Sequence, residues 1–182
     1  MPIIDSHAHI FPADFGPAPA GCDPAQWPSL EPGPDETTKF LVNGPMRFPA
    51  KTVWFEAERR LEASAASGLD AELLSPFPAL LNYRSPAEVG RDLCRVTNEY
   101  IAGLAAAFPT RFYGLGTVPM QDPDMASAEL TEVAKAALAG VAEGDLQARV
   151  LVRHPASDDR RGPKRGLRAD PERGGGRARE PV

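Results

Sequence analysis

Two histidines near the N-terminus, His7 and His9, are spaced so that both could bind one metal ion. They fall in residues 2–10, where β-branched residues predict a β-strand. Side chains alternate across a strand, so we expect Asp5, His7 and His9 to project from one face. Neutral imidazole is a common ligand of Zn²⁺ and similar divalent ions. Surface or core histidines also occur at this spacing, and Asp5 either supports an imidazole or caps the strand edge.

The elements that must position these histidines alternate between strand and helix. The predicted elements after the first strand are a helix over 54–67, a strand over 69–75, a helix from 85 to 108, a strand over 111–118, a helix over 122–140 and a strand that starts at 140–141. This alternation is typical of βαβ units with a parallel sheet. His7 and His9 end the first strand, and barrel active sites form at the carboxyl ends of strands.

Residues 11–53 contain nine prolines and little periodicity. Connections of this length are usually functional or disordered. Trp27, Phe40, Met46 and Phe48 give the segment apolar surface to pack. We therefore expect an ordered, proline-rich inserted loop region over the site.

The charge of the 182-residue chain is unevenly distributed. Residues 1–141 carry a net charge of −8 and residues 142–182 one of +3, and the latter contain no Phe, Tyr or Trp. We expect this Arg/Gly-rich tail to be disordered, because it has little apolar surface to bury. A reading-frame change near Ala142 is one hypothesis for its composition.

Composition also limits the class of protein. The acidic balance disfavours a nucleic-acid binder, and no apolar run is long enough for a membrane span. The N-terminus lacks the layout of a signal peptide. Cys22 and Cys94 have no metal-binding spacing, so we expect a reduced, cytoplasmic protein.

Several longer segments resemble a known family. These are DSHAHIFP, MRF around Arg47, GLDAELLSPFPALLNY, LCRVTNEYIAGLAAAFPTRFYGLGTVPMQDP and SAELTEVAKAALAGV. Over roughly residues 3–141 they resemble the amidohydrolase superfamily, in the branch of aminocarboxymuconate-semialdehyde decarboxylase. Ser64-Ala65 departs from this branch, which commonly has Met-Asp at that place.

The resemblance implies a metal-dependent (β/α)₈ barrel, usually with zinc, that decarboxylates without oxidation or hydrolyses small carboxylated substrates. His7 and His9 match its first two metal ligands. Arg47 matches an arginine that binds a substrate carboxylate, a role that suits a guanidinium. The other interpretation of Arg47 is a solvated loop charge.

The same resemblance implies two further histidines and an aspartate, whereas this chain has three histidines in total. His154 is a weak candidate for a later metal ligand, and the catalytic residues stay unassigned. A whole barrel takes roughly 250 residues, so we expect residues 1–141 to form a partial barrel of about three βα units. We therefore expect this chain to bind metal weakly and to be inactive.

Other residues admit structural interpretations. Phe77, Asn82 and Tyr83 would line the mouth of the site or simply pack, and Cys94 is expected to be a buried apolar residue. Gly114 and Gly116 indicate close backbone packing rather than a dinucleotide motif. The alternative function is a non-catalytic fragment or interaction protein that pairs through an open sheet edge, as a homodimer or with a complementary barrel half.

Overall fold

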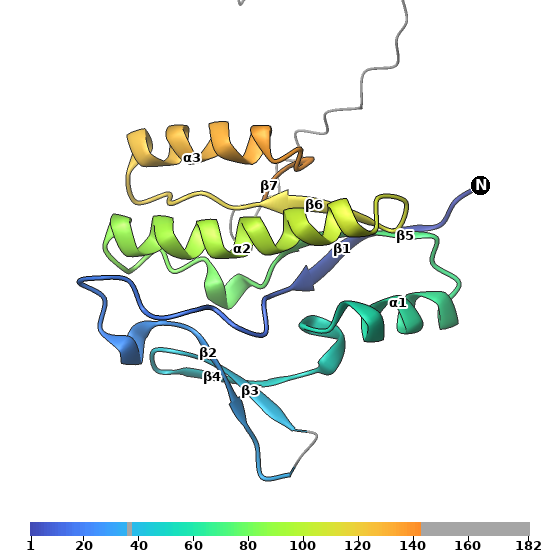
Figure 1. Ribbon diagram of the computed structural model, residues 1–182, viewed down its shortest axis with the longest axis horizontal. Coiled ribbons are helices and arrows are strands. Elements are labelled where there is room, and N and C mark those ends of the chain that lie inside the picture. Colours follow the sequence, from blue (N-terminus) through green and yellow to red (C-terminus); the bar gives the residue numbers. More distant parts are fainter. Residues whose placement is uncertain (36–37, 143–182) are drawn as a thin grey trace, which may run out of the picture.

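A four-stranded sheet forms the centre of the molecule, a computed structural model that describes residues 1–35 and 38–142 (Figure 1). Its strands, in spatial order, are β1 (Ile4–Ile10), β5 (Ala71–Pro76), β6 (Phe112–Gly116) and β7 (Gly140–Val141). Every neighbouring pair is parallel, from Ile4 beside Ala71 to Gly116 beside Val141. The expected alternation of strand and helix and the parallel sheet are confirmed.

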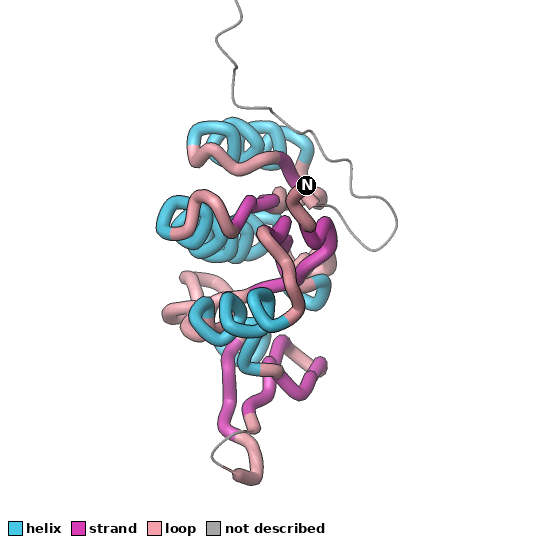
Figure 2. Tube along the Cα trace, turned by 90° about the vertical axis from the view of Figure 1, so that its right-hand side faces the viewer, coloured by secondary structure: helices cyan, strands magenta, loops and turns pink. Residues whose placement is uncertain are grey.

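Three helices connect these strands: α1 (Ala57–Ala66), α2 (Ala87–Ala107) and α3 (Pro123–Lys135). Seen from the side, they lie on one side of the parallel sheet (Figure 2). The core between the two layers is apolar and includes Ile10, Leu74, Ile101, Phe112 and Val133. β1–α1, β5–α2 and β6–α3 are thus the three βα units that the sequence predicts.

Local sequence signals explain where the helices begin and end. Asp122 caps α3, because its carboxylate accepts hydrogen bonds from the main-chain nitrogens of Asp124 and Met125. Gly68, just after α1, has a φ of 72°, the left-handed conformation that favours glycine. Pro86 is the N-cap of α2, and no side chain caps that helix.

Glycines allow α2 and α3 to lie close to β6. A Cβ atom on Gly114 would lie 2.5 Å from Cδ2 of Leu138 and 2.6 Å from Cγ2 of Ile101. A Cβ atom on Gly116 would lie 2.9 Å from both Asn98 and Val133. Real Cβ atoms do not come this close, so both glycines lie in close packing, as expected, but against side chains and not against another backbone.

The inserted region between β1 and α1 contains a second sheet, where the sequence predicts a loop region. Its antiparallel strands lie in the order β2 (Ser29–Pro32), β3 (Lys39–Asn43) and β4 (Met46–Ala50), below the parallel sheet in Figure 1. The sequence does not predict this sheet, because its prolines usually indicate an interrupted strand. Pro32 and Pro49 lie in the two edge strands, where proline is tolerated, and central β3 has none.

A second apolar cluster joins the inserted region to the rest of the fold. It includes Phe11, Trp27 and Leu41 from the chain between β1 and α1, and Val89 and Leu93 from α2. Trp27 is buried and Phe48 packs edge-on against Phe77, as the expected ordered segment requires. Met46 is exposed, so its predicted packing role is wrong.

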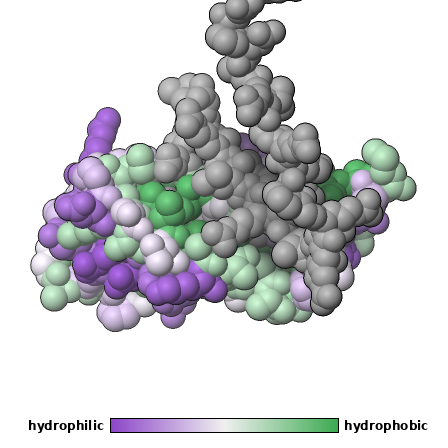
Figure 3. Space-filling view, turned by 90° about the horizontal axis from the view of Figure 1, so that it is seen from above, coloured by the Kyte–Doolittle hydropathy of each residue, from purple (hydrophilic) through white to green (hydrophobic). Residues whose placement is uncertain are grey.

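The surface mixes polar and apolar side chains. On the face shown in Figure 3, hydrophilic residues dominate the left-hand part, and a small hydrophobic group lies toward the middle. No helix within residues 1–35 and 38–142 is long and apolar enough to cross a bilayer. The predictions about the tail concern residues outside the described part of the chain.

Candidate metal site

The imidazole rings of His7 and His9 lie together at the carboxyl end of β1. Their centroids are 4.7 Å apart and the ring planes meet at 78°. Both residues line a cavity of about 310 Å³. His7 is exposed and His9 is half-buried, so one imidazole is fixed within the fold while the other borders solvent. The two histidines that the sequence predicts as a pair are close in space.

The strand that carries them is not regular. β1 has one extra residue between Asp5 and Ala8 relative to β5, which is a β-bulge. Despite this bulge, Asp5 lines the same cavity as His7 and His9. Its carboxylate accepts a hydrogen bond from the main-chain nitrogen of His7, at 2.9 Å. Of the two predicted roles for Asp5, the structure shows the main-chain cap.

The end of β5 orients the His9 ring. Nδ1 of His9 lies 3.1 Å from the carbonyl oxygen of Pro76 and 3.0 Å from the Ser75 hydroxyl. That hydroxyl lies 3.3 Å from the carbonyl oxygen of Ala8, which accepts its proton. A carbonyl oxygen only accepts, so Nδ1 carries a proton, and in the neutral ring Nε2 then carries the lone pair. Metal-binding histidines use this arrangement, in which one nitrogen donates to the protein and the other binds the ion.

A buried ion pair lies beside the histidines. Arg60 of α1 donates to the Glu72 carboxylate of β5, and both side chains are buried. Ser64 donates to the other carboxylate oxygen of Glu72, at 2.6 Å. These three residues line the same cavity as His7 and His9. The Glu72 carboxylate is therefore held by Arg60 and Ser64 within the fold.

The donor set of the described residues fits part of a metal site. Imidazole nitrogens suit Zn²⁺ and other divalent transition ions, and the His9 tautomer is the required one. Within residues 1–35 and 38–142, no group of three or more His, Cys, Asp or Glu side chains is arranged to hold a metal ion. His154, the weak candidate for a later ligand, lies outside the described residues.

Arg47 lies apart from this cavity. It is on β4, where its guanidinium pairs with Glu31 of β2 and lies 4.3 Å above the centre of the Phe40 ring. About half of its side chain is exposed, and it is not among the residues that line the histidine cavity. The structure therefore does not bring Arg47 together with His7 and His9.

The three residues predicted to line the mouth of the site lie in two different cavities. Phe77 lines the histidine cavity, with its ring centroid 6.1 Å from that of His9. Asn82 and Tyr83 line a different cavity of about 680 Å³, against the turn between β3 and β4. Only Phe77 is thus at the predicted location.

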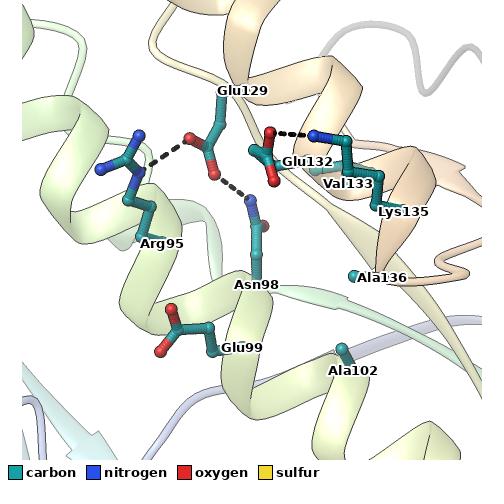
Figure 4. A pocket seen from close by; sticks show the side chains of 9 residues that line it. All are labelled: Arg95, Asn98, Glu99, Ala102, Glu129, Glu132, Val133, Lys135 and Ala136. Carbon is teal, nitrogen blue, oxygen red and sulfur yellow. Dashed lines mark hydrogen bonds and ion pairs between the residues drawn. The ribbon is translucent and has the colours of Figure 1, made fainter.

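A further cavity, of about 630 Å³, lies between α2 and α3 (Figure 4). Four of its charged groups form two ion pairs: Glu129 accepts from Arg95, as well as from the Asn98 amide, and Lys135 donates to Glu132. Asn98 also binds both main-chain polar groups of Thr117, just after β6. This network joins the two helices to the sheet and contains no histidine.

Cys94 is buried in α2, as the sequence indicates. Burial raises the pKa of its thiol to about 12, and the nearby Glu129 carboxylate adds to the rise. A thiol with so high a pKa stays protonated and is a poor nucleophile. This agrees with the prediction of a buried apolar role.

Sequence reasoning missed the residues that hold the histidines in place. Arg60, Glu72 and Ser75 are all polar and all buried. The available signal was a carboxylate and a hydroxyl within the otherwise apolar strand segment AELLSP, since buried polar side chains need partners. Nothing local in the sequence shows that Arg60 rather than Arg59 faces inward.

Comparisons with known proteins place the fold. The sequence pattern of the amidohydrolase family matches residues 4–171, further along the chain than the motifs indicated. The solved structure of Metarhizium anisopliae IDCase in apo form superposes with a TM-score of 0.60 at 14% identity, covering 77% of this chain and 41% of that one. A structure described as a putative amidohydrolase from Staphylococcus aureus gives 0.52 at 17% identity, covering 78% and 36%. At these identities the likeness shows the fold alone.

Curated relatives are decarboxylases. The chain is 26% identical over 127 residues to 2-amino-3-carboxymuconate-6-semialdehyde decarboxylase of Dictyostelium discoideum, covering 70% of this chain and 35% of that protein. It is 30% identical over 78 residues to gamma-resorcylate decarboxylase of Polaromonas sp., covering 43% and 24%. The chain thus spans about a third or less of the length of these relatives. The family pattern covers most of the chain, which therefore belongs to the amidohydrolase family.

Proposed function

We propose that this chain supplies the first metal-binding strand of a zinc-dependent, or other divalent-metal-dependent, decarboxylase of small carboxylated substrates. The observation that carries the proposal is the His7–His9 pair with the Nδ1 atom of His9 bonded to the end of β5. The similarity to decarboxylases supports the reaction class. Hydrolysis of a small carboxylated substrate is the other reaction that family membership favours.

The roles of the residues follow from their positions. His7 and His9 would hold the ion, and Ser75 and Pro76 would keep Nε2 of His9 directed toward it. When bound, the metal would orient the substrate and stabilise the negative charge that develops there. Phe77 would form an apolar wall of the cavity beside His9.

Arg47 is proposed as the residue that binds a substrate carboxylate, from its position outside the histidine cavity. Its present partner, Glu31, is itself a carboxylate, so the guanidinium already has the contact that such a substrate would make. A substrate would have to displace Glu31 from Arg47. Glu31 and the substrate carboxylate would therefore compete for Arg47, and this competition can be measured.

We propose further that the 182-residue chain binds metal weakly and has no turnover by itself, because it contains only three histidines. The test is titration of the purified full chain with Zn²⁺, followed by assay of CO₂ release from hydroxylated benzoates. We expect binding of one equivalent that His7→Ala or His9→Ala abolishes, and no CO₂ release. Zinc binding that both variants retain would contradict the assignment, and catalytic CO₂ release would contradict the claim of inactivity.

The second candidate function is an interaction protein that pairs through the edge of its sheet. β1 is an edge strand within the described residues. Its first residue, Ile4, is 50% exposed, and Ile3 just before it is 58% exposed. An exposed apolar edge favours pairing with another strand, from a second copy or from a complementary barrel half. Size measurements on the chain and on Ile4→Lys test this: a dimer that the added charge dissociates supports pairing, and a monomer in both cases excludes the homodimer.

A further inference from the structure

The side chain of Arg60 links four elements of the fold around the histidine pair. Its Nε donates to Glu72 of β5, and its Nη1 donates to the carbonyl oxygens of His9 at 2.9 Å and Val53 at 3.0 Å. Val53 belongs to the short helix η2 (Thr52–Trp54), which precedes α1. One guanidinium thus joins α1 to β1, β5 and η2.

Arg60 contacts the main chain of His9 on the side of β1 that has no neighbouring strand. β1 is at the edge of the sheet, so within the described residues no neighbouring strand supplies a donor on its outer side. Arg60 supplies that donor to His9, and the carbonyl oxygen of Trp54 accepts from the main-chain nitrogen of Phe11 at 2.9 Å. The end of β1 is therefore held by α1 and η2 instead of by a strand.

His9 is consequently anchored at two places. Its ring is bonded to Ser75 and Pro76, on the β5 side, and its carbonyl oxygen is bonded to Arg60, on the opposite side of the strand. The first anchor sets the tautomer of the ring. The second fixes the main chain from which the ring projects, so both are needed to direct Nε2.

We propose that Arg60 is a positioning residue for the His7–His9 pair, acting through the carbonyl oxygen of His9, with Glu72 as its counter-ion. This inference rests on the proposed function for its metal-binding consequence. Its structural part concerns the His9 ring itself and holds with or without metal.

Arg60→Lys is the first test, and Arg59→Lys is the matched control. Lysine keeps the charge beside Glu72, but its single nitrogen lacks the planar fork that reaches a carboxylate and two carbonyls together. Arg59 is the preceding residue in α1, is 61% exposed and pairs with Glu62. We expect about tenfold weaker Co²⁺ binding in Arg60→Lys, as for other residues that orient metal ligands, and no change in Arg59→Lys.

A double variant, Arg60→Met with Glu72→Leu, separates positioning from stability. It removes the ion pair without leaving a lone buried charge, so the fold is retained. We expect a melting temperature near that of the wild type, with Co²⁺ binding still weakened. Recovery of wild-type Co²⁺ affinity in this variant, or equal affinities in Arg60→Lys and Arg59→Lys, would show that Arg60 is only structural.

Nitrogen NMR of the His9 ring in the metal-free chain makes the test independent of the proposed function. We expect one tautomer, protonated at Nδ1, in the wild type and in Arg59→Lys. We expect a mixture of tautomers in Arg60→Lys and the double variant, because a His9 main chain released from Arg60 would carry the ring away from the Pro76 carbonyl oxygen. If the wild type binds no Co²⁺ but these NMR signals behave as expected, the proposed function fails and the positioning role stands. An unchanged His9 tautomer in both Arg60 variants would overturn the positioning role.

Discussion

Nδ1 of His9 lies 3.1 Å from the carbonyl oxygen of Pro76, so the last residue of the second parallel strand orients an imidazole on the first. Parallel neighbours end at the same edge of a sheet, which brings these two residues side by side although 67 positions separate them. The candidate metal site thus depends on two strands even though both of its histidines come from one.

The Ser75 hydroxyl should contribute to metal binding without touching the ion. Ser75→Ala removes the oxygen 3.0 Å from Nδ1 of His9 but leaves the Pro76 carbonyl in place. We expect a severalfold loss of Zn²⁺ affinity by calorimetric titration, and a loss of about 1 kcal/mol in the free energy of unfolding. Ser67→Ala is the control, because Ser67 lines the same cavity but is exposed; an equal effect there would argue against a role for Ser75.

Substitutions of Glu31 and of Arg47 should change the affinity for substrate in opposite directions if Arg47 binds a substrate carboxylate. Glu31→Gln removes the competing carboxylate and should strengthen the binding of a hydroxylated benzoate, whereas Arg47→Gln should weaken it. Both changes should alter the free energy of unfolding by less than about 1 kcal/mol, because the pair is exposed. Calorimetry with the benzoate measures the first effect, and weaker binding in both variants would count against direct competition.

Among the residues that line the cavity between α2 and α3, substitution of Asn98 should cause the largest loss in the free energy of unfolding. Its amide binds the main-chain nitrogen of Thr117 at 2.7 Å and the carbonyl oxygen of Thr117 at 2.9 Å (Figure 4 shows its contact with Glu129). Asn98→Ala leaves these buried groups without partners, so we expect a loss of about 2–3 kcal/mol in urea unfolding. Glu99→Ala, beside it but exposed, should change the free energy of unfolding by less than about 0.5 kcal/mol.

The two cysteines should differ in reactivity. Cys94 is buried, with a pKa raised from 9.0 to about 12, whereas Cys22 is partly exposed. At pH 9.5 a thiol reagent should therefore label Cys22 quickly and Cys94 only when the chain unfolds. Mass spectrometry after timed labelling shows which is modified, and equally fast labelling of both would contradict the buried position of Cys94.

The same pKa shift has a consequence for stability. The thiolate is tolerated better in the unfolded chain than in the folded one, so the free energy of unfolding should fall as the pH rises from about 9 toward 12. Cys94→Ala removes this contribution. The variant should therefore lose less stability than the wild type between pH 8.5 and 10.5, measured by urea unfolding at each pH.

The sequence predicted those elements of the fold that depend on local sequence signals. The β-branched residues around His7 and His9 predicted β1, and Asp122 before Pro123 predicted the start of α3. The sheet of the inserted region was missed, because Pro32 and Pro49 look like strand breakers until their strands are known to be edges. Strand pairing between distant segments is a property of the whole fold and not of a local pattern.

For the candidate site as well, only the features that depend on local sequence were predicted. The His7–His9 pair follows from a spacing of two residues on a strand, but its support by Arg60 and Ser75 depends on contacts across 51 and 66 positions. The bulge between Asp5 and Ala8 was also beyond prediction, since an extra residue in β1 is defined only relative to β5. Arg47 was placed by resemblance, and its partner Glu31 depends on the unpredicted sheet.

X-ray absorption at the zinc edge of the loaded full chain shows directly whether His7 and His9 bind the ion. We expect scattering from two imidazole nitrogens at about 2.0–2.1 Å, lost when His7→Ala and His9→Ala are combined. A coordination shell that contains only oxygen, or one that the double variant leaves unchanged, would contradict the assignment of His7 and His9 as metal ligands.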